Sequence, residues 1–259
     1  MNRIEAHAVG KRYARFAIQR PRKVKEALFR GMGGLRPVDT FWALRQVSVE
    51  VAAGKMLGVI GTNGSGKSTL LKLIGGLSRP DEGTLVVRGR VVGLLELGTG
   101  FHPDLTGREN VFINGVVTGL TRREVSEQFD SIVAFAGVEA FIDSPLRTYS
   151  SGMRMRLGFA VMAHTRPEVL LIDEVLAVGD LAFQKKCVAR IATFKADGCA
   201  VVLVSHNLEA VTETCDEVLW LQHGNVVARG PAEPTVTSYR QANEDDDADE
   251  TGAHDDDGG

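Results

Sequence analysis

Eight consecutive residues in the first third of the chain have the types and spacing needed to bind a phosphate group. They read Gly61-Thr62-Asn63-Gly64-Ser65-Gly66-Lys67-Ser68 and fit the pattern G-x-x-x-x-G-K-[ST] in full. Glycines let the backbone wrap around an anion, and successive N–H groups with the following helix N-terminus point at it. Lys67 adds a charge for the β- and γ-phosphates, and Ser68 a hydroxyl for Mg²⁺. We expect this loop, with Thr69, to bind ATP; flanking strand and helix patterns disfavour an ordinary glycine-rich turn.

Two adjacent acids form a second chemical motif. Asp173 and Glu174 follow the apolar run Val169–Ile172, which predicts a buried strand. Asp173 has the chemistry to hold Mg²⁺ through a water molecule. Glu174 can polarise an attacking water as a general base. A pair of acids that caps a helix is the alternative, but beside a phosphate-binding loop the pair predicts nucleotide hydrolysis.

A third motif places small residues at the start of another helix. Tyr149-Ser150-Ser151-Gly152-Met153 precedes the helical run Arg154–Ala163. A helix N-terminus of this kind attracts anions. One chain needs a single γ-phosphate site, so a second site is explained if it serves a nucleotide bound by another subunit.

This third motif resembles the signature sequence of ABC ATPases, normally Leu-Ser-Gly-Gly-Gln. Tyr149, Ser151 and Met153 replace the Leu, the first Gly and the Gln. The variant resembles bacterial polysaccharide exporters of the O-antigen, teichoic-acid and galactan kind (the Wzm/Wzt type), and the resemblance extends to about residue 243. It implies an α/β fold: a P-loop, RecA-like ABC ATPase core with an N-terminal antiparallel β subdomain and an inserted α-helical subdomain.

The same resemblance implies roles for four more residues. Asp180 matches the D-loop aspartate that reaches across a dimer, and His206 matches the switch histidine that contacts the γ-phosphate. Tyr13 matches the aromatic residue that stacks on adenine, with an exposed edge-strand aromatic as the alternative. Glu96 stands where most ABC ATPases have Gln, so we expect it to act in catalysis and Mg²⁺ binding. A register slip of one residue would change the role of Glu96.

A basic stretch separates the first two predicted strands. Lys11–Arg45 carries ten Lys or Arg residues and two acids, Glu26 and Asp39. In the exporters that this chain resembles, an insertion here (about 20–40) forms a helix near the membrane, and a short helix is possible around Val24–Gly31. Such a segment could attract the diphosphate of a lipid-linked sugar or anionic headgroups; a solvated basic loop is the alternative. Asp104–Asn110 lies where such proteins contact their membrane partner.

The elements that must position these residues alternate between strand and helix. This alternation predicts a mostly parallel sheet. The predicted strands are Ile4–Phe16, Leu44–Val51, Met56–Ile60, Val169–Ile172 and Ala200–Ser205, with a hairpin of Val218–Leu221 and Asn225–Arg229. The predicted helices are Lys67–Ile74, several within 105–165, Leu181–Asp197, Leu208–Cys215 and one from Ala232. We expect one ABC ATPase domain over 1–243.

Composition limits the remaining possibilities. No apolar run approaches ~18 residues and no signal peptide is visible, so we expect the protein to stay in the cytoplasm. The resemblance to exporters implies that it lies at the cytoplasmic face of the membrane, peripheral through a permease. Cys187, Cys199 and Cys215 have no metal-ligand spacing and predict buried, reduced thiols. Residues 244–259 hold nine of the 33 acids, which leaves 24 acids against 30 Lys and Arg elsewhere. This acidic tail is expected to be disordered.

The motifs together predict an ATPase that powers export. Two copies should form a head-to-tail dimer over two ATP molecules, with Ser150 and Gly152 of each copy completing the site of the other. The expected partners are a multi-span membrane permease and a lipid-linked (polyprenyl-diphosphate) glycan such as cell-wall galactan, with no nucleic acid. The alternatives are an ABC transporter ATPase for another substrate, or a soluble ABC ATPase acting on ribosomes or DNA.

Overall fold

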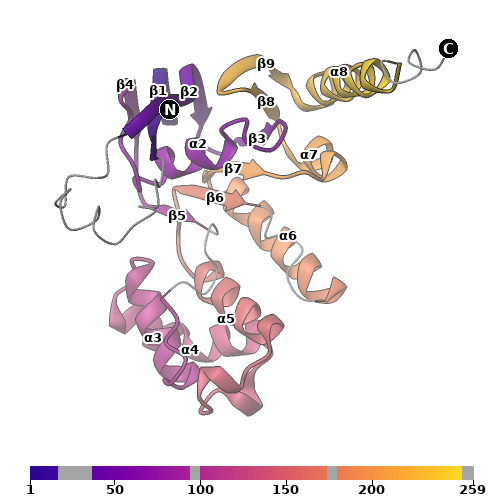
Figure 1. Ribbon diagram of the computed structural model, residues 1–259. Coiled ribbons are helices and arrows are strands. Elements are labelled where there is room, and N and C mark those ends of the chain that lie inside the picture. The colour runs from indigo at the N-terminus through magenta and orange to yellow at the C-terminus, as the bar shows by residue number, and fades with distance from the viewer. Residues whose placement is uncertain (17–36, 94–99, 174–179, 253–259) are drawn as a thin grey trace, which may run out of the picture.

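The computed structural model describes residues 1–16, 37–93, 100–173 and 180–252 of the 259-residue chain (Figure 1). An upper lobe holds two β-sheets, and a lower lobe of helices is joined to it (Figure 1). Three predictions fall outside the described residues: the helix of the basic insertion, the role of Glu96 and the role of Glu174.

The central sheet of the upper lobe is parallel except at one edge. Its described strands follow the order β5-β6-β7-β3-β8-β9, and only β9 runs antiparallel to its neighbour. The strands are β3 (Met56–Ile60), β5 (Val91–Gly93), β6 (Val169–Asp173), β7 (Ala200–Val204), β8 (Glu217–Gln222) and β9 (Asn225–Pro231). Every residue of β3 and β7 is buried, as the continuous apolar runs predicted.

Both faces of this sheet are covered, because alternate residues of each strand join different hydrophobic clusters. Leu170 and Ile172 pack on the face covered by α6 (Leu181–Ala196), α7 (Leu208–Thr214) and α8 (Ala232–Gly252). Val169 and Leu171 pack on the opposite face, against α2 and the N-terminal sheet. Helix α2 spans Lys67–Ile74, the range predicted from the sequence.

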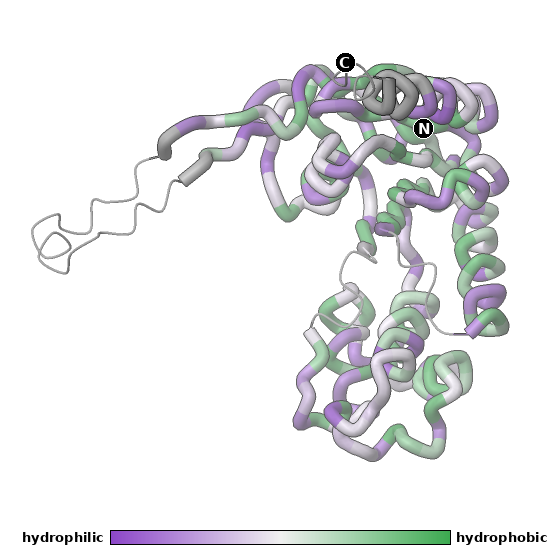
Figure 2. The backbone as a smooth tube through the Cα atoms, turned by 45° about the vertical axis from the view of Figure 1, so that its right-hand side comes forward, coloured by the Kyte–Doolittle hydropathy of each residue, from purple (hydrophilic) through white to green (hydrophobic). Residues whose placement is uncertain are grey.

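The N-terminal sheet is antiparallel and has the order β2-β1-β4 among the described residues. Its strands are β1 (Asn2–Phe16), β2 (Pro37–Ala52) and β4 (Glu82–Val87). Strand β4 was not predicted; it pairs with β1 between Ile4 and Gly10. Beyond Gly10, β1 pairs with β2 alone, and the two strands continue as an arm that leaves the lobe (Figure 2).

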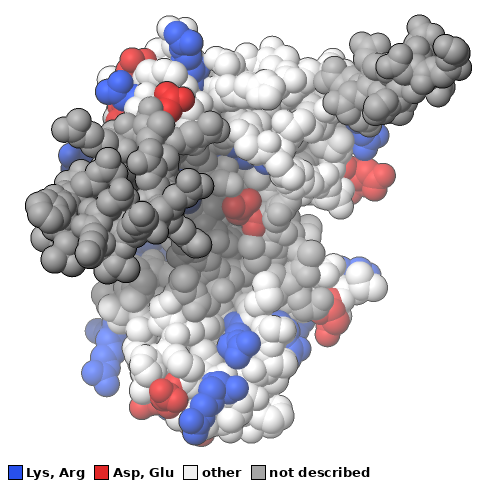
Figure 3. Space-filling model, viewed as in Figure 1, with Lys and Arg blue, Asp and Glu red and all other residues white. Residues whose placement is uncertain are grey.

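The lower lobe is inserted between β5 and β6. Its helices are α3 (Gly107–Val117), α4 (Arg122–Ala136) and α5 (Ser151–Ala163), and they share their own hydrophobic core. The predicted capping box opens α4: Thr121 accepts from the backbone N–H of Glu124, and the Glu124 carboxylate accepts from the backbone N–H of Thr121. Acidic and basic side chains are interspersed over the visible face of this lobe (Figure 3).

Helix α8 departs from the prediction for the acidic tail. Residues 244–252 are helical, whereas the sequence predicted disorder from residue 244; residues 253–259 lie outside the described residues. Two residues of α8 pack against the upper lobe: Val236 is buried, and the ring centroid of Tyr239 lies 5.4 Å from that of Trp220 in β8. Once a helix is nucleated, each further residue costs little, and after Pro234 in the first turn neither Pro nor Gly interrupts it before Gly252.

Within the described ranges, no helix has the length and apolar character that a bilayer crossing requires.

Candidate nucleotide-binding site

The glycine-rich loop lies at the carboxyl edge of the central sheet. It connects the buried strand β3 to helix α2, and Asp173 ends β6 while His206 follows β7. Since β6, β7 and β3 are neighbours and run parallel, their carboxyl ends meet at one edge. This is where open α/β sheets bind ligands, so the fold itself brings these separate motifs together.

The loop is packed on one side and open on the other. Gly66 has φ +109°, and a Cβ there would lie 2.5 Å from the carbonyl oxygen of Ala43 and 2.6 Å from a Leu44 methyl. A Cβ at Gly64, with φ +79°, would meet no atom within 4 Å. The open side of the loop therefore has room for a ligand, while the packed side holds its shape.

Lys67 is held over the loop by the loop's own carbonyl groups. Its Nζ donates to the carbonyl oxygens of Gly61 at 2.7 Å and Thr62 at 2.9 Å, and the residue is only 7% exposed. Ser65, also in the loop, is buried, and its hydroxyl oxygen has no hydrogen-bond partner in the described part of the chain. A buried ammonium group beside a run of backbone N–H groups suits an anion such as phosphate.

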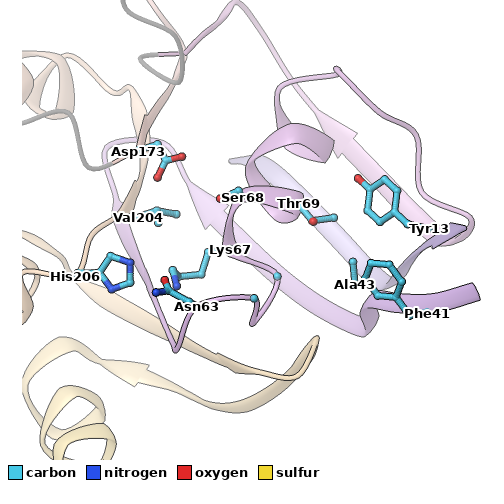
Figure 4. Close-up of a pocket in the computed structure, with 12 residues that line it drawn as sticks. Tyr13, Phe41, Ala43, Asn63, Lys67, Ser68, Thr69, Asp173, Val204 and His206 are labelled. Carbon is cyan, nitrogen blue, oxygen red and sulfur yellow. The ribbon is translucent and has the colours of Figure 1, made fainter. Parts of the chain in front are cut away.

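A pocket of about 390 Å³ joins the loop to both neighbouring strand ends. This volume falls in the range of small-molecule sites. Its lining comprises Tyr13, Phe41, Ala43, Asn63, Gly64, Gly66, Lys67, Ser68, Thr69, Asp173, Val204 and His206. Figure 4 shows the two aromatic rings at one end, Asp173 and His206 at the other, and the loop between them.

The aromatic end of the pocket comes from the hairpin of β1 and β2. Tyr13 and Phe41 are register partners, and their ring centroids are 6.1 Å apart with an interplanar angle of 36°. Both residues are partly exposed, at 36% and 43%. Apolar ring faces on one wall of a pocket suit a flat base.

Phe41, Ala43 and Val204 were not among the predicted site residues. Phe41 and Ala43 alternate along β2, so both side chains point to the face that Tyr13 shares. Phe41 could have been predicted from the sequence by pairing the two strands as a hairpin, which sets this aromatic residue opposite Tyr13.

The polar end of the pocket offers oxygen ligands. Ser68 is an exposed residue at the start of α2, and Asp173 is half-buried at the end of β6. Oxygen donors of this kind match the preference of Mg²⁺. The predicted roles of Glu96 and Glu174 stay predictions, because both lie outside the described residues.

The predicted signature residues lie in the other lobe and do not line this pocket. Ser150 is the N-cap of α5, where its hydroxyl accepts from the backbone N–H of Met153 at 3.2 Å. Ser150 and Ser151 are exposed, and Gly152 and Met153 are half-buried.

Asp180 also caps a helix. Its carboxylate accepts from the backbone N–H of Phe183 at 2.8 Å at the start of α6. Its predicted contact across a dimer stays a prediction.

Comparison with known proteins identifies the family. The family profile described as "ABC transporter" matches residues 44–177. The O-antigen export system ATP-binding protein RfbB of Myxococcus xanthus is 49% identical over 82% of this chain. An RfbB of Klebsiella pneumoniae is 46% identical over 78%, and the teichoic acids export ATP-binding protein TagH of Lactiplantibacillus plantarum is 40% identical over 94%.

These relatives differ in length. The matched region spans about half of the Myxococcus protein (49%), 82% of the Klebsiella protein and 66% of the Lactiplantibacillus protein. A solved structure of the ATP-binding subunit of an ABC transporter has a TM-score of 0.71 at 21% identity, covering 91% of this chain and 92% of its own. That likeness confirms the predicted fold class, and the sequence matches confirm the predicted resemblance. This chain belongs to the ABC transporter family and carries its ATP-binding cassette.

Proposed function

We propose that this chain binds and hydrolyses ATP to power export of a lipid-linked polysaccharide across the cytoplasmic membrane. The observation that carries the proposal is one pocket in which Lys67, Ser68, Asp173 and His206 meet two aromatic rings. The relatives' names, which specify O-antigen and teichoic acid export, support the substrate class.

ATP fits the pocket in one orientation. The adenine contacts Tyr13 and Phe41, and the phosphates follow the loop toward Lys67, whose charge offsets theirs. Asp173 and His206 then lie at the γ-phosphate end. Reversing the nucleotide would place the phosphates against two aromatic rings and leave the loop N–H groups without an anion.

Ser68 and Asp173 are the described residues that would hold Mg²⁺. When bound, Mg²⁺ neutralises charge on the β- and γ-phosphate oxygens. Glu174 is the proposed general base, which takes a proton from the attacking water, and Glu96 is proposed to assist in catalysis and Mg²⁺ binding. His206 orients the γ-phosphate from the end of β7.

The complete site needs a second copy of the chain. Ser150 caps α5 in the helical lobe, away from the chain's own pocket lining. A head-to-tail dimer brings the start of α5 in one copy to the γ-phosphate held by the other, where the helix N-terminus stabilises the anion. Asp180 is proposed to contact the second copy. Closure and reopening of this dimer would move a multi-span permease, which holds the chain at the cytoplasmic face of the membrane.

The test replaces the chain in cells with the Glu174→Gln variant. A variant that binds ATP but barely hydrolyses it should block export. Polyprenyl-diphosphate-linked glycan measured by mass spectrometry should then accumulate inside the cell. If hydrolysis is lost and no such glycan accumulates, the substrate belongs to another class.

A further inference from the structure

The residues just before the signature motif are tied to the start of helix α3. Four backbone hydrogen bonds link the segments 103–108 and 142–147. They run from Leu146 N–H to Leu105 O (2.8 Å), Arg147 N–H to Pro103 O (2.8 Å), Gly107 N–H to Ser144 O (3.1 Å) and Arg108 N–H to Ile142 O (2.8 Å). The start of α3 and the turn before α5 therefore form one connected structure within the helical lobe.

Side chains reinforce this connection. Arg108 makes two hydrogen bonds to the carboxylate of Asp143, at 2.7 and 3.3 Å. These bonds hold the pKa of Asp143 below its usual range, so the carboxylate stays charged at neutral pH. Arg147 and Asp104 form a second ion pair at 3.6 Å. Both pairs are solvent-exposed and contribute modestly to stability, but both join the same two segments.

Tyr149 closes the connection from the inside. The residue is 3% exposed, and its hydroxyl donates to the carbonyl oxygen of Phe141 at 2.6 Å. The rings of Tyr149 and Phe141 meet edge to face, with centroids 6.5 Å apart. A Cβ at Gly107, the first residue of α3, would overlap the Tyr149 hydroxyl. The phenol of Tyr149 therefore occupies the space that a side chain at position 107 would need.

The residue after Tyr149 is the helix cap Ser150. Ser150 has extended backbone and accepts from Met153 N–H, so its hydroxyl stands at the start of α5. Because Tyr149 is fully packed and hydrogen-bonded, the backbone that enters Ser150 has little freedom. If the start of α3 shifts, Gly107 presses against the phenol of Tyr149. Because Tyr149 and Ser150 are adjacent in the chain, this displacement also moves Ser150.

We propose that Tyr149 is a positioning residue that fixes Ser150 relative to the start of α3 and thereby sets how well Ser150 meets the nucleotide of the second copy. This inference rests on the proposed function, in which Ser150 serves the partner's ATP. The phenol acts through Ser150 and touches no reacting atom. Burial and the charge of Asp143 raise the pKa of Tyr149, so the hydroxyl keeps the proton it donates through neutral and mildly alkaline pH.

The test removes the hydroxyl alone. The full chain and its Tyr149→Phe variant are purified in mild detergent with the membrane proteins that stay bound. The kcat and KM for Mg-ATP hydrolysis and the melting temperature are then measured. The kcat should fall about 3- to 10-fold, the factor expected from loss of one hydrogen bond. The KM should change less than about 2-fold, because each chain's own loop binds ATP.

Thr148→Val is the matched control. It removes a hydroxyl that donates to the carbonyl oxygen of Pro145 at 2.7 Å in the same turn, and that hydroxyl makes no bond to α3. This variant should keep the kcat of the unmodified chain. Loss of a buried hydrogen bond should also lower the melting temperature somewhat, so kcat is measured well below the melting temperature of both proteins. An unchanged kcat in Tyr149→Phe under these conditions overturns the inference, and so does a rise in KM as large as the fall in kcat, since that shows a general loss of structure. An inactive unmodified chain would instead contradict the proposed function.

A second pair of variants tests the contact with α3. Gly107→Ala should lower kcat, because the added methyl group displaces the phenol. In the Tyr149→Phe background the methyl group meets the ring Cζ position at 3.1 Å and Ile142 O at 3.0 Å, a tight but tolerable fit. The double variant should therefore lose less kcat than the product of the two single effects. Independent effects of the two changes would overturn the coupling.

Discussion

Two glycines of the same loop should respond very differently to alanine. Both Gly64 and Gly66 have positive φ, +79° and +109°, which costs an alanine about 1–2 kcal/mol. Gly66 carries a second cost, because its Cβ would lie 2.5 Å from Ala43 O and 2.6 Å from Leu44 Cδ2. Overpacking of this kind adds about 1–3 kcal/mol. We expect Gly66→Ala to lower the free energy of unfolding by about 2–5 kcal/mol, and Gly64→Ala by about 1–2 kcal/mol.

Urea denaturation followed by circular dichroism measures both changes, and a fluorescent ATP analogue measures binding. Both variants should weaken ATP binding: Gly66→Ala because relief of the overlap shifts the backbone of the loop, and Gly64→Ala because its methyl group enters the space that is open to the ligand. Equal losses of stability in the two variants would refute the claim that the loop is packed at Gly66 and open at Gly64.

Two further predictions concern the pocket's aromatic wall and the core. Phe41→Ala and Tyr13→Ala should each raise the KM for ATP several-fold, because each variant removes a ring from the same wall of the pocket. The control is Phe141→Ala, which removes an exposed ring from the other lobe and should leave the KM for ATP unchanged. Equal KM values for Phe41→Ala and the unmodified chain would exclude that ring from ATP binding. Burial raises the pKa of the Cys187 and Cys199 thiols to about 12 and that of Cys215 to about 11. A raised thiol pKa leaves almost no thiolate at pH 8, so a thiol reagent should label none of the three in the native chain and all three after denaturation; rapid labelling of the native chain would show that the core is not packed as described.

Much of the central sheet could be predicted because its strands are continuous apolar runs. The bounds of β3 and α2 match the predicted ranges, since a buried strand, a glycine-rich loop and a helix follow one another without ambiguity. Strand β4 was missed because Glu82–Val87 is largely exposed or half-buried and shows no clear apolar alternation. Its place is decided by pairing with β1, which is a long-range contact.

The polar end of the pocket was easier to predict than the aromatic end. The loop, Asp173 and His206 each follow a predicted parallel strand, and parallel strands end at the same edge. Phe41 and Ala43 enter the pocket through the register of β1 with β2, which sequence periodicity does not determine. The contact of Tyr149 with Gly107 was equally hidden, because it depends on the packing of two turns that are far apart in the sequence.

The central claim is that this pocket hydrolyses ATP, and phosphate release by the purified chain tests it most directly. The unmodified chain with Mg-ATP should release phosphate, and Lys67→Ala should release almost none, because it loses the buried ammonium group of the loop. Lys72→Ala, which changes an exposed lysine on the same helix, should keep full activity. Equal phosphate release by the unmodified chain and Lys67→Ala would contradict the claim.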